Sequence, residues 1–292
     1  MRRKQLIWVG KVLLLTLIVG ILARKIDFQA LAHLLRTADP AGLFWAAVWF
    51  VFSKIIAAHR FRMLYQAEGG AISSRDNLRL YWVGMYYNLL LPGGVSGDGY
   101  KIKVLSDRSG LSLKRLVWVA LLDRISGAAA LARLLLIMLC FIPISTVWSA
   151  LWIGGLVLSF PIERQIYRKV GRGMYDVWVK IALWAFPVQI AQSVSALGLI
   201  YSLGGWNDYL VYSALFLASS IAAMTPLTIG GAGARELTFL YGAGLFGLQA
   251  EKAVGIAFIF YVLSSLIAFT GVFWSFRATV FANDGKDFYG DN

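Results

Sequence analysis

The chain has 292 residues, of which 59% are hydrophobic and 15% are charged, and its mean hydropathy is +0.68. These values exclude an ordinary soluble domain and predict an all-α, polytopic integral membrane protein. The net charge of +13 does not indicate a nucleic-acid partner, because the basic residues lie between apolar segments and are typical of topology signals and anionic-lipid contacts.

The first apolar segment, within residues 1–25, has the charged and apolar regions of a secretory signal but lacks a small-x-small cleavage site. We interpret it as the first membrane helix. Further apolar segments are expected at about 41–58, 78–91, 116–142, 147–160, 181–203, 209–224 and 253–276. Since a bilayer crossing needs ~20 residues, the sequence predicts about six to eight transmembrane helices, with two of the segments short by that measure.

We expect a single transmembrane domain over residues 1–280, with halves of roughly 1–145 and 146–280, and a short polar tail at 281–292. Between residues 160 and 180, apolar side chains recur every four residues opposite basic ones, which predicts a helix lying on the membrane surface. The positive-inside rule places this helix and the N-terminus in the cytoplasm and Asp208 outside.

Both short segments run into stretches rich in proline and glycine, NLLLPGGVSGDGYK at 88–101 and TPLTIGGAGARE at 225–236. Irregular backbone persists at depth in a membrane only where protein or water covers it. Two matched breaks, one in each half, predict broken or re-entrant helices around a transport site, a pattern also compatible with an inverted repeat. For one break alone, a tight loop at the membrane surface would use the same residues. We expect the two loops to approach each other within the membrane.

Two charged residues, Asp123 and Arg124, lie well inside the apolar run 116–142. Neither has an oppositely charged residue one turn away, so pairing must come from another segment. A structural ion pair between helices and a role in substrate movement both remain open. We also expect Arg124 and Arg235 each to lie near a carboxylate of another segment or a bound anion.

Three stretches, NLLLPGGVSGD, LLDRISG and the run that begins PLTIGGAGARELTF, occur in that order. Together they resemble the transmembrane domain of the lysylphosphatidylglycerol synthases (multiple peptide resistance factors) and their stand-alone flippase-like relatives. The resemblance implies a multi-pass domain of the inner (cytoplasmic) membrane that translocates an anionic or aminoacylated phospholipid, or a polyprenyl-linked lipid, between leaflets. The lipid- or substrate-binding positions that it implies are Asn88, Gly93, Gly94, Gly97, Asp98, Asp123, Arg124, Gly230, Gly231, Gly233, Arg235 and Glu236, with structural breaks at Pro92 and Pro226.

In this interpretation, the two broken segments form a polar cavity between the halves. Arg124 and Arg235 hold an anionic head group, while Asp98, Asp123 and Glu236 balance the charge and the tails stay in lipid. Buried acids that carry protons for coupled transport are a second role that the sequence allows.

The synthases continue into a soluble aminoacyl-transfer domain, whereas this chain ends 16 residues past Phe276, so we expect no such transfer. The sequence contains no nucleophile–base set, phosphate-binding loop or metal-spaced cluster, so we expect no enzyme activity, no metal and no other cofactor. The expected partners are membrane lipids, with a separate lipid synthase or a second copy of the chain as further candidates. A membrane-embedded lipid-modifying transferase and a non-catalytic scaffold for a lipid synthase are the alternative functions.

Overall fold

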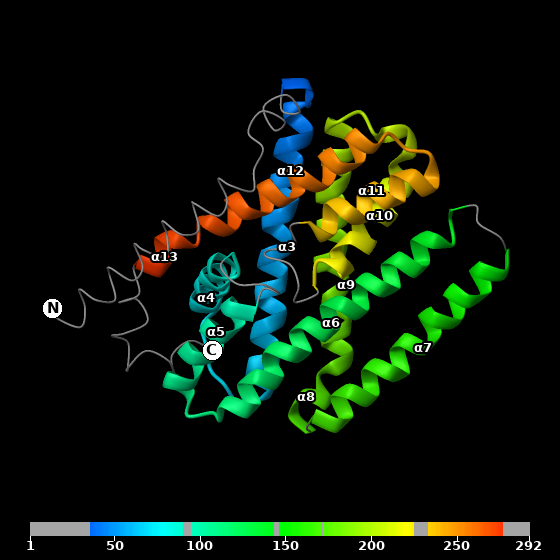
Figure 1. Ribbon diagram of the computed structural model, residues 1–292. Helices are drawn as coiled ribbons and strands as arrows, with labels where there is room; N and C mark the ends of the chain where they lie inside the picture. Colours follow the sequence, from blue (N-terminus) through cyan, green and yellow to red (C-terminus); the bar gives the residue numbers. More distant parts are fainter. Residues whose placement is uncertain (1–35, 90–94, 143–145, 171, 225–232, 277–292) are drawn as a thin grey trace.

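The structure, a computed structural model, describes residues 36–89, 95–142, 146–170, 172–224 and 233–276 (Figure 1). Within these ranges the chain is helical and contains no strand, which confirms the all-α prediction. The predicted first membrane helix lies outside the described residues. So do six of the predicted site residues, namely Pro92, Gly93, Gly94, Pro226, Gly230 and Gly231.

The helices follow a long, short, short, long order that occurs twice. In α3 to α6 the lengths are 28, 14, 15 and 27 residues, and in α9 to α12 they are 25, 14, 13 and 20. The bounds are α3 (Pro40–Ala67), α4 (Ser74–Tyr87), α5 (Val95–Ser109), α6 (Leu113–Leu139), α7 (Thr146–Val170), α8 (Arg172–Asp176), α9 (Trp178–Ser202), η1 (Trp206–Asp208), α10 (Tyr209–Ala222), α11 (Ala234–Phe246), α12 (Ala250–Phe269) and α13 (Val272–Phe276).

The first long helices of the two sets, α3 and α9, pack against each other in antiparallel directions and make the most extensive helix pair described. The backbone N–H of Asp39 donates to the carbonyl of Ser202 at 3.0 Å. One turn further along, a Cβ added to Gly42 would lie 2.7 Å from the carbonyl oxygen of Gly198. Small residues therefore bring the two backbones into direct contact, as is common between membrane helices.

Three stretches of helix are long and apolar enough to cross a membrane: 40–67, 178–202 and 250–276. On α3, large apolar side chains point outward at Phe44, Val48, Phe52 and Ile55, which are 43–74% exposed. An apolar exterior on a long helix is expected where lipid is the solvent. The structure thus confirms a membrane protein, while the larger number of crossings stays a prediction.

The predicted surface helix at 160–180 is wrong in its bounds, because α7 runs without interruption through Pro161 to Val170. Its inner face packs on α6, where Glu163 is 2% exposed and lies 2.6 Å from Arg133. The hydroxyl of Tyr167 donates to a carbonyl of α6 at 3.3 Å. The sequence pattern showed the basic outer face of this stretch. Only the packing against α6 shows that Glu163 and Tyr167 form a buried inner face.

Two pairs of short helices, α4–α5 and α10–α11, form helical hairpins on opposite sides of α3 in Figure 1. Helices of this length extend ~20–22 Å, less than the ~30 Å of a hydrocarbon core. The segments that join the members of each pair, 90–94 and 225–232, lie outside the described residues. The predicted breaks therefore fall between the members of two pairs of half-length helices, and re-entry of these hairpins into the membrane stays a prediction.

Candidate functional site

A cavity of about 270 Å³ lies among α3, α4, α5, α6 and α9. This volume falls below the ~300–1,000 Å³ that pockets for drug-sized ligands occupy, so the cavity suits a polar head group better than a whole lipid. Its lining residues are Lys54, Ala57, Arg60, Tyr81, Gly84, Met85, Asn88, Asp98, Lys101, Asp123, Arg124, Gly127, Val188, Gln189, Gln192 and Met224.

The cavity lies at the middle of the long helices. Lys54 is at the centre of α3, and Gly127 and Gln189 lie close to the centres of α6 and α9. The backbone carbonyl of Gly127 accepts a hydrogen bond from the Gln189 amide at 3.2 Å, which joins the two helices at this level. Polar groups at this depth are far from both helix ends.

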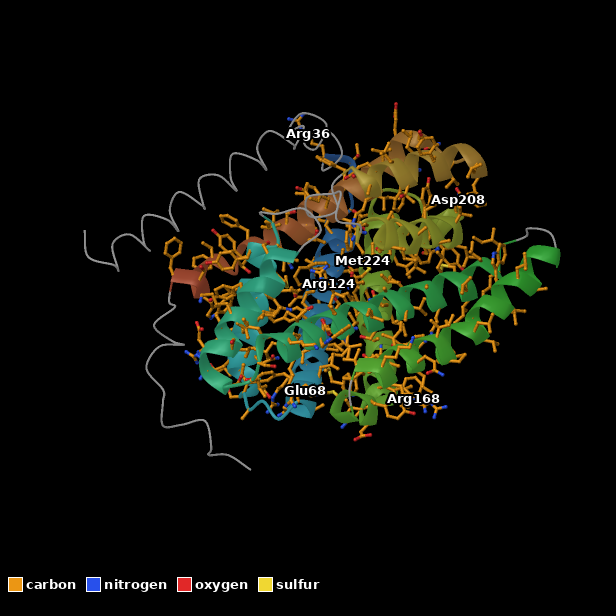
Figure 2. The ribbon with its side chains drawn as sticks, turned by 60° about the horizontal axis from the view of Figure 1, so that its bottom comes forward. Arg36, Glu68, Arg124, Arg168, Asp208 and Met224 are labelled. Carbon is orange, nitrogen blue, oxygen red and sulfur yellow. The ribbon has the colours of Figure 1, made fainter. Side chains whose placement is uncertain are left out.

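Figure 2 shows the middle of the long helices after a turn of 60° about the horizontal axis. Arg124 and Met224 lie close together near the centre of the molecule, between Arg36 at one end and Glu68 at the other. Both central residues line the cavity. Asn88 and Met224, which precede the two hairpin loops, therefore converge on one cavity, whereas the predicted approach of the loops themselves falls outside the described residues.

Arg60 and Asp123 form a buried ion pair between α3 and α6. The Nε of Arg60 lies 2.8 Å from a carboxylate oxygen of Asp123, and one Nη donates to the backbone carbonyl of Asp123 at 2.9 Å. Both residues are at most 6% exposed. Burial of two charges is costly, and the ion pair with its added hydrogen bond offsets part of that cost, so each side chain holds the other in the cavity wall. The expected partner of Asp123 thus comes from another segment.

Asp98 lies between two cations. Its carboxylate is 2.7 Å from the ammonium of Lys101 and forms a second ion pair with Arg124. Lys101 is 5% exposed, and its ammonium also lies 4.2 Å from the centre of the Phe61 ring. The predicted partner of Arg124 on another segment is therefore confirmed, and one carboxylate serves two basic side chains.

The predicted residues Asn88 and Gly97 hold the first hairpin together. The side-chain oxygen of Asn88 accepts from the backbone N–H of Gly97 at 2.7 Å, and so satisfies a donor in the first turn of α5. A Cβ on Gly97 would meet the carbonyl oxygen of Gly84 at 2.0 Å. Glycine is therefore required here for the close approach of α4 and α5, and these helix ends supply Gly84, Asn88 and Asp98 to the cavity wall.

The predicted residues of the second hairpin lie off the cavity. Gly233 has φ +87 and precedes α11, and the carboxylate of Glu236 accepts from its backbone N–H at 2.7 Å. Arg235 donates to the hydroxyl of Ser220 at 2.9 Å, and its guanidinium lies 4.9 Å from the centre of the Phe260 ring. Of the two expected partners of Arg235, a carboxylate of another segment does not occur among the described residues, and a bound anion stays a prediction. An arginine can be accommodated in this way because aromatic faces attract cations.

The sequence analysis missed the other polar side chains of the cavity, which are Lys54, Arg60, Tyr81, Lys101, Gln189 and Gln192. Lys54 could have been found, since it is an ionisable residue inside the apolar run 41–58. Such residues are energetically costly in a membrane and therefore mark candidate functional positions. Its ammonium lies 4.5 Å from the centre of the Phe50 ring, and it forms no ion pair with the described residues.

A bundle of lipid-facing helices that encloses a charged polar cavity at mid-depth defines a polytopic membrane protein with an internal polar site. The transmembrane region of the lysylphosphatidylglycerol synthases matches residues 8–162, more than half of the chain. The chain belongs to this family, which indicates a membrane function related to lipids. No curated protein and no solved structure matches the chain. The family match includes α3 to α6 but not α9 or the second hairpin. The resemblance of the second break, at 225–236, to the family therefore rests on its sequence motif alone.

Proposed function

We propose that the protein translocates a phosphate-bearing lipid head group between the leaflets of the inner membrane. The observation that carries this proposal is the polar cavity at the middle of the long helices, with walls from both halves of the chain. A head group that crosses a bilayer needs polar contacts at the depth where lipid supplies none. The acyl or prenyl tails stay in lipid beside the apolar outer face of the helices.

The ion pairs suggest how a head group enters. Asp98 is an internal counter-ion for Lys101 and Arg124. A lipid phosphate can take over those two cations, because charge-assisted hydrogen bonds from arginine and lysine suit phosphate as well as carboxylate. The Arg60–Asp123 pair is more fully enclosed and holds its geometry during this exchange. Neither step requires a covalent change, so the proposed role is not enzymatic.

The charge distribution favours one orientation. The end that contains Glu68 and Arg168 in Figure 2 also carries the basic residues that begin α4, α6 and α9. Arg115 at the start of α6 pairs with Glu68 at 3.7 Å, which places these helix ends together. The positive-inside rule then puts this end in the cytoplasm and Asp208 outside. In that frame the two short hairpins enter the membrane from opposite sides, as expected for an inverted repeat.

Reconstitution in proteoliposomes tests the proposal. Purified protein should move a tail-labelled fluorescent phosphatidylglycerol across the bilayer, measured as the fraction that a membrane-impermeant quencher reaches. Gly127→Leu should stop this movement, because it places a side chain in the cavity wall next to Arg60.

The matched control is Gly99→Leu on α5, at an exposed position where an added Cβ meets no atom within 4 Å. This variant should move lipid at the wild-type rate. A wild type that moves no lipid of any class refutes translocation and favours the scaffold. A covalently altered lipid in the same vesicles favours the transferase.

A further inference from the structure

The charges around the cavity do not balance. Its described lining contains four basic side chains and two carboxylates, which leaves two positive charges in excess. The loop segments 90–94 and 225–232 contain no ionisable residue in the sequence, so they do not change this balance. An excess of buried positive charge is unfavourable unless an anion neutralises it.

The excess can be located. Arg60 and Asp123 neutralise each other, while Lys101 and Arg124 share the single carboxylate of Asp98. Together these three side chains carry a net charge of +1. Lys54 supplies the second excess charge.

Lys54 lies on the face of α3 that carries Phe50 and Ala57, and this face points into the protein. Its ammonium lies over the Phe50 ring and forms no ion pair with any described carboxylate. The charged groups that interact with it electrostatically are Arg60 and Asp123 of the cavity wall and Arg235 at the start of α11. Lys54 therefore projects a positive charge into the cavity at the point where the first half faces the second hairpin.

Resting on the proposed function, we propose that the cavity selects lipids whose head group ends in a phosphate with two negative charges, and that Lys54 is the selectivity residue. Lysine and arginine side chains bind such a phosphate through several charge-assisted hydrogen bonds. A terminal phosphate carries about −1.5 to −2 charges at pH 7, which matches the excess. A lysyl ester of phosphatidylglycerol carries two ammonium groups and one phosphate, so the cavity repels it.

The test compares tail-labelled lipids with matched acyl chains in the same vesicles: phosphatidic acid, phosphatidylglycerol, phosphatidylcholine and lysylphosphatidylglycerol. The wild type should move phosphatidic acid fastest and lysylphosphatidylglycerol slowest, at rates that differ by roughly 10-fold or more. A prenyl monophosphate serves as a second source of the same head group. Equal rates for phosphatidic acid and the prenyl monophosphate would show that the phosphate alone is selected. A faster rate for one of them would show that its tail also contributes.

Lys54→Glu removes the excess positive charge, so the ratio of rates for phosphatidic acid and lysylphosphatidylglycerol should fall to about one or below. Lys54→Arg keeps the charge and should keep the preference. The matched control is Lys103→Glu, the same substitution on α5 at a side chain that is 78% exposed. It should leave the ratio unchanged.

A second measurement separates this inference from the proposed function. In detergent micelles, phosphatidic acid should raise the Tm of the wild type more than lysylphosphatidylglycerol does, and Lys54→Glu should remove that difference. A protein that shows this difference but moves no lipid refutes translocation and retains the selectivity. A wild type that moves, or is stabilised by, lysylphosphatidylglycerol as well as phosphatidic acid overturns the inference.

Discussion

The two short hairpins have the same architecture and use their charges differently. In α4–α5, Asp98 and Lys101 face the cavity and connect the hairpin to α6 through Arg124. In α10–α11, Glu236 is used to cap its own helix, and Arg235 lies against an aromatic ring and a serine. Similar proline- and glycine-rich breaks therefore do not imply similar chemistry. The first hairpin provides polar groups to the cavity, and the second closes against its neighbours.

The largest expected effect concerns the ionic link of the first hairpin. Asp98→Ala removes the shared partner of Lys101 and leaves a buried ammonium without its carboxylate. We expect a loss of about 3–5 kcal/mol in the free energy of unfolding, measured by denaturant titration in micelles. The control is Asp107→Ala, an exposed carboxylate on the same helix, with a change below about 0.5 kcal/mol. Equal stability of the two variants would show that the ion pairs of Asp98 do not stabilise the first hairpin.

The next effect compares two arginines in transport. In the proposed function, Arg124→Ala removes a direct contact of ~2–3 kcal/mol with the head group, so the translocation rate should fall by roughly 30- to 150-fold. Arg235 lies off the cavity, so Arg235→Ala removes only a long-range electrostatic interaction with the head group and should reduce the rate by less than about 5-fold. The vesicle assay measures both rates. An equal loss for Arg235→Ala would show that the second hairpin also contacts the lipid.

A smaller effect tests the packing of the first hairpin. Gly97→Ala forces a methyl group against the carbonyl of Gly84 and should lower the free energy of unfolding by about 1–3 kcal/mol. The same change at Gly99, where an added Cβ meets no atom within 4 Å, should be neutral or stabilise by up to ~1 kcal/mol. Denaturant titration of the pair isolates the close approach from the general effect of removing a helical glycine.

The smallest expected effect concerns the second hairpin. Glu236→Gln weakens the hydrogen bond to the backbone N–H of Gly233 and removes a negative charge from the N-terminus of α11. We expect a loss of about 0.3–1 kcal/mol in stability with an unchanged rate of lipid movement. A strong loss of transport with intact folding would give Glu236 a role in the site and make the two hairpins equivalent.

Much of the fold could be predicted because lipid imposes a strong pattern on helices. The apolar run 181–203 predicted α9 within a few residues, and the two short runs before the breaks predicted α4 and α10. The continuity of α7 could not be predicted in this way. Glu163 and Arg133 lie 30 positions apart, and only the tertiary packing shows that they neutralise each other and allow α7 to continue along α6.

The site was predicted in part. Charges inside apolar runs and next to breaks identified Asp98, Asp123 and Arg124. Isolated charges are energetically costly in a membrane and therefore indicate an ion pair or a functional site. The identity of each partner was not accessible from one sequence, since Arg60 reaches Asp123 across 63 positions. The aromatic environment of Arg235 was missed for the same reason: its ring comes from α12.

The contact between Gly42 and Gly198 has a consequence for how the molecule can move. Backbones that meet without intervening side chains leave no soft layer along which α3 and α9 could slide or tilt. The two halves are therefore joined as one frame, and rocking of one half against the other would have to separate this contact. In the proposed function, gating would fall instead to the short hairpins, next to whose loop segments Asn88 and Met224 line the cavity. Access from each leaflet would then alternate through small displacements of the hairpins around a stationary pair of long helices.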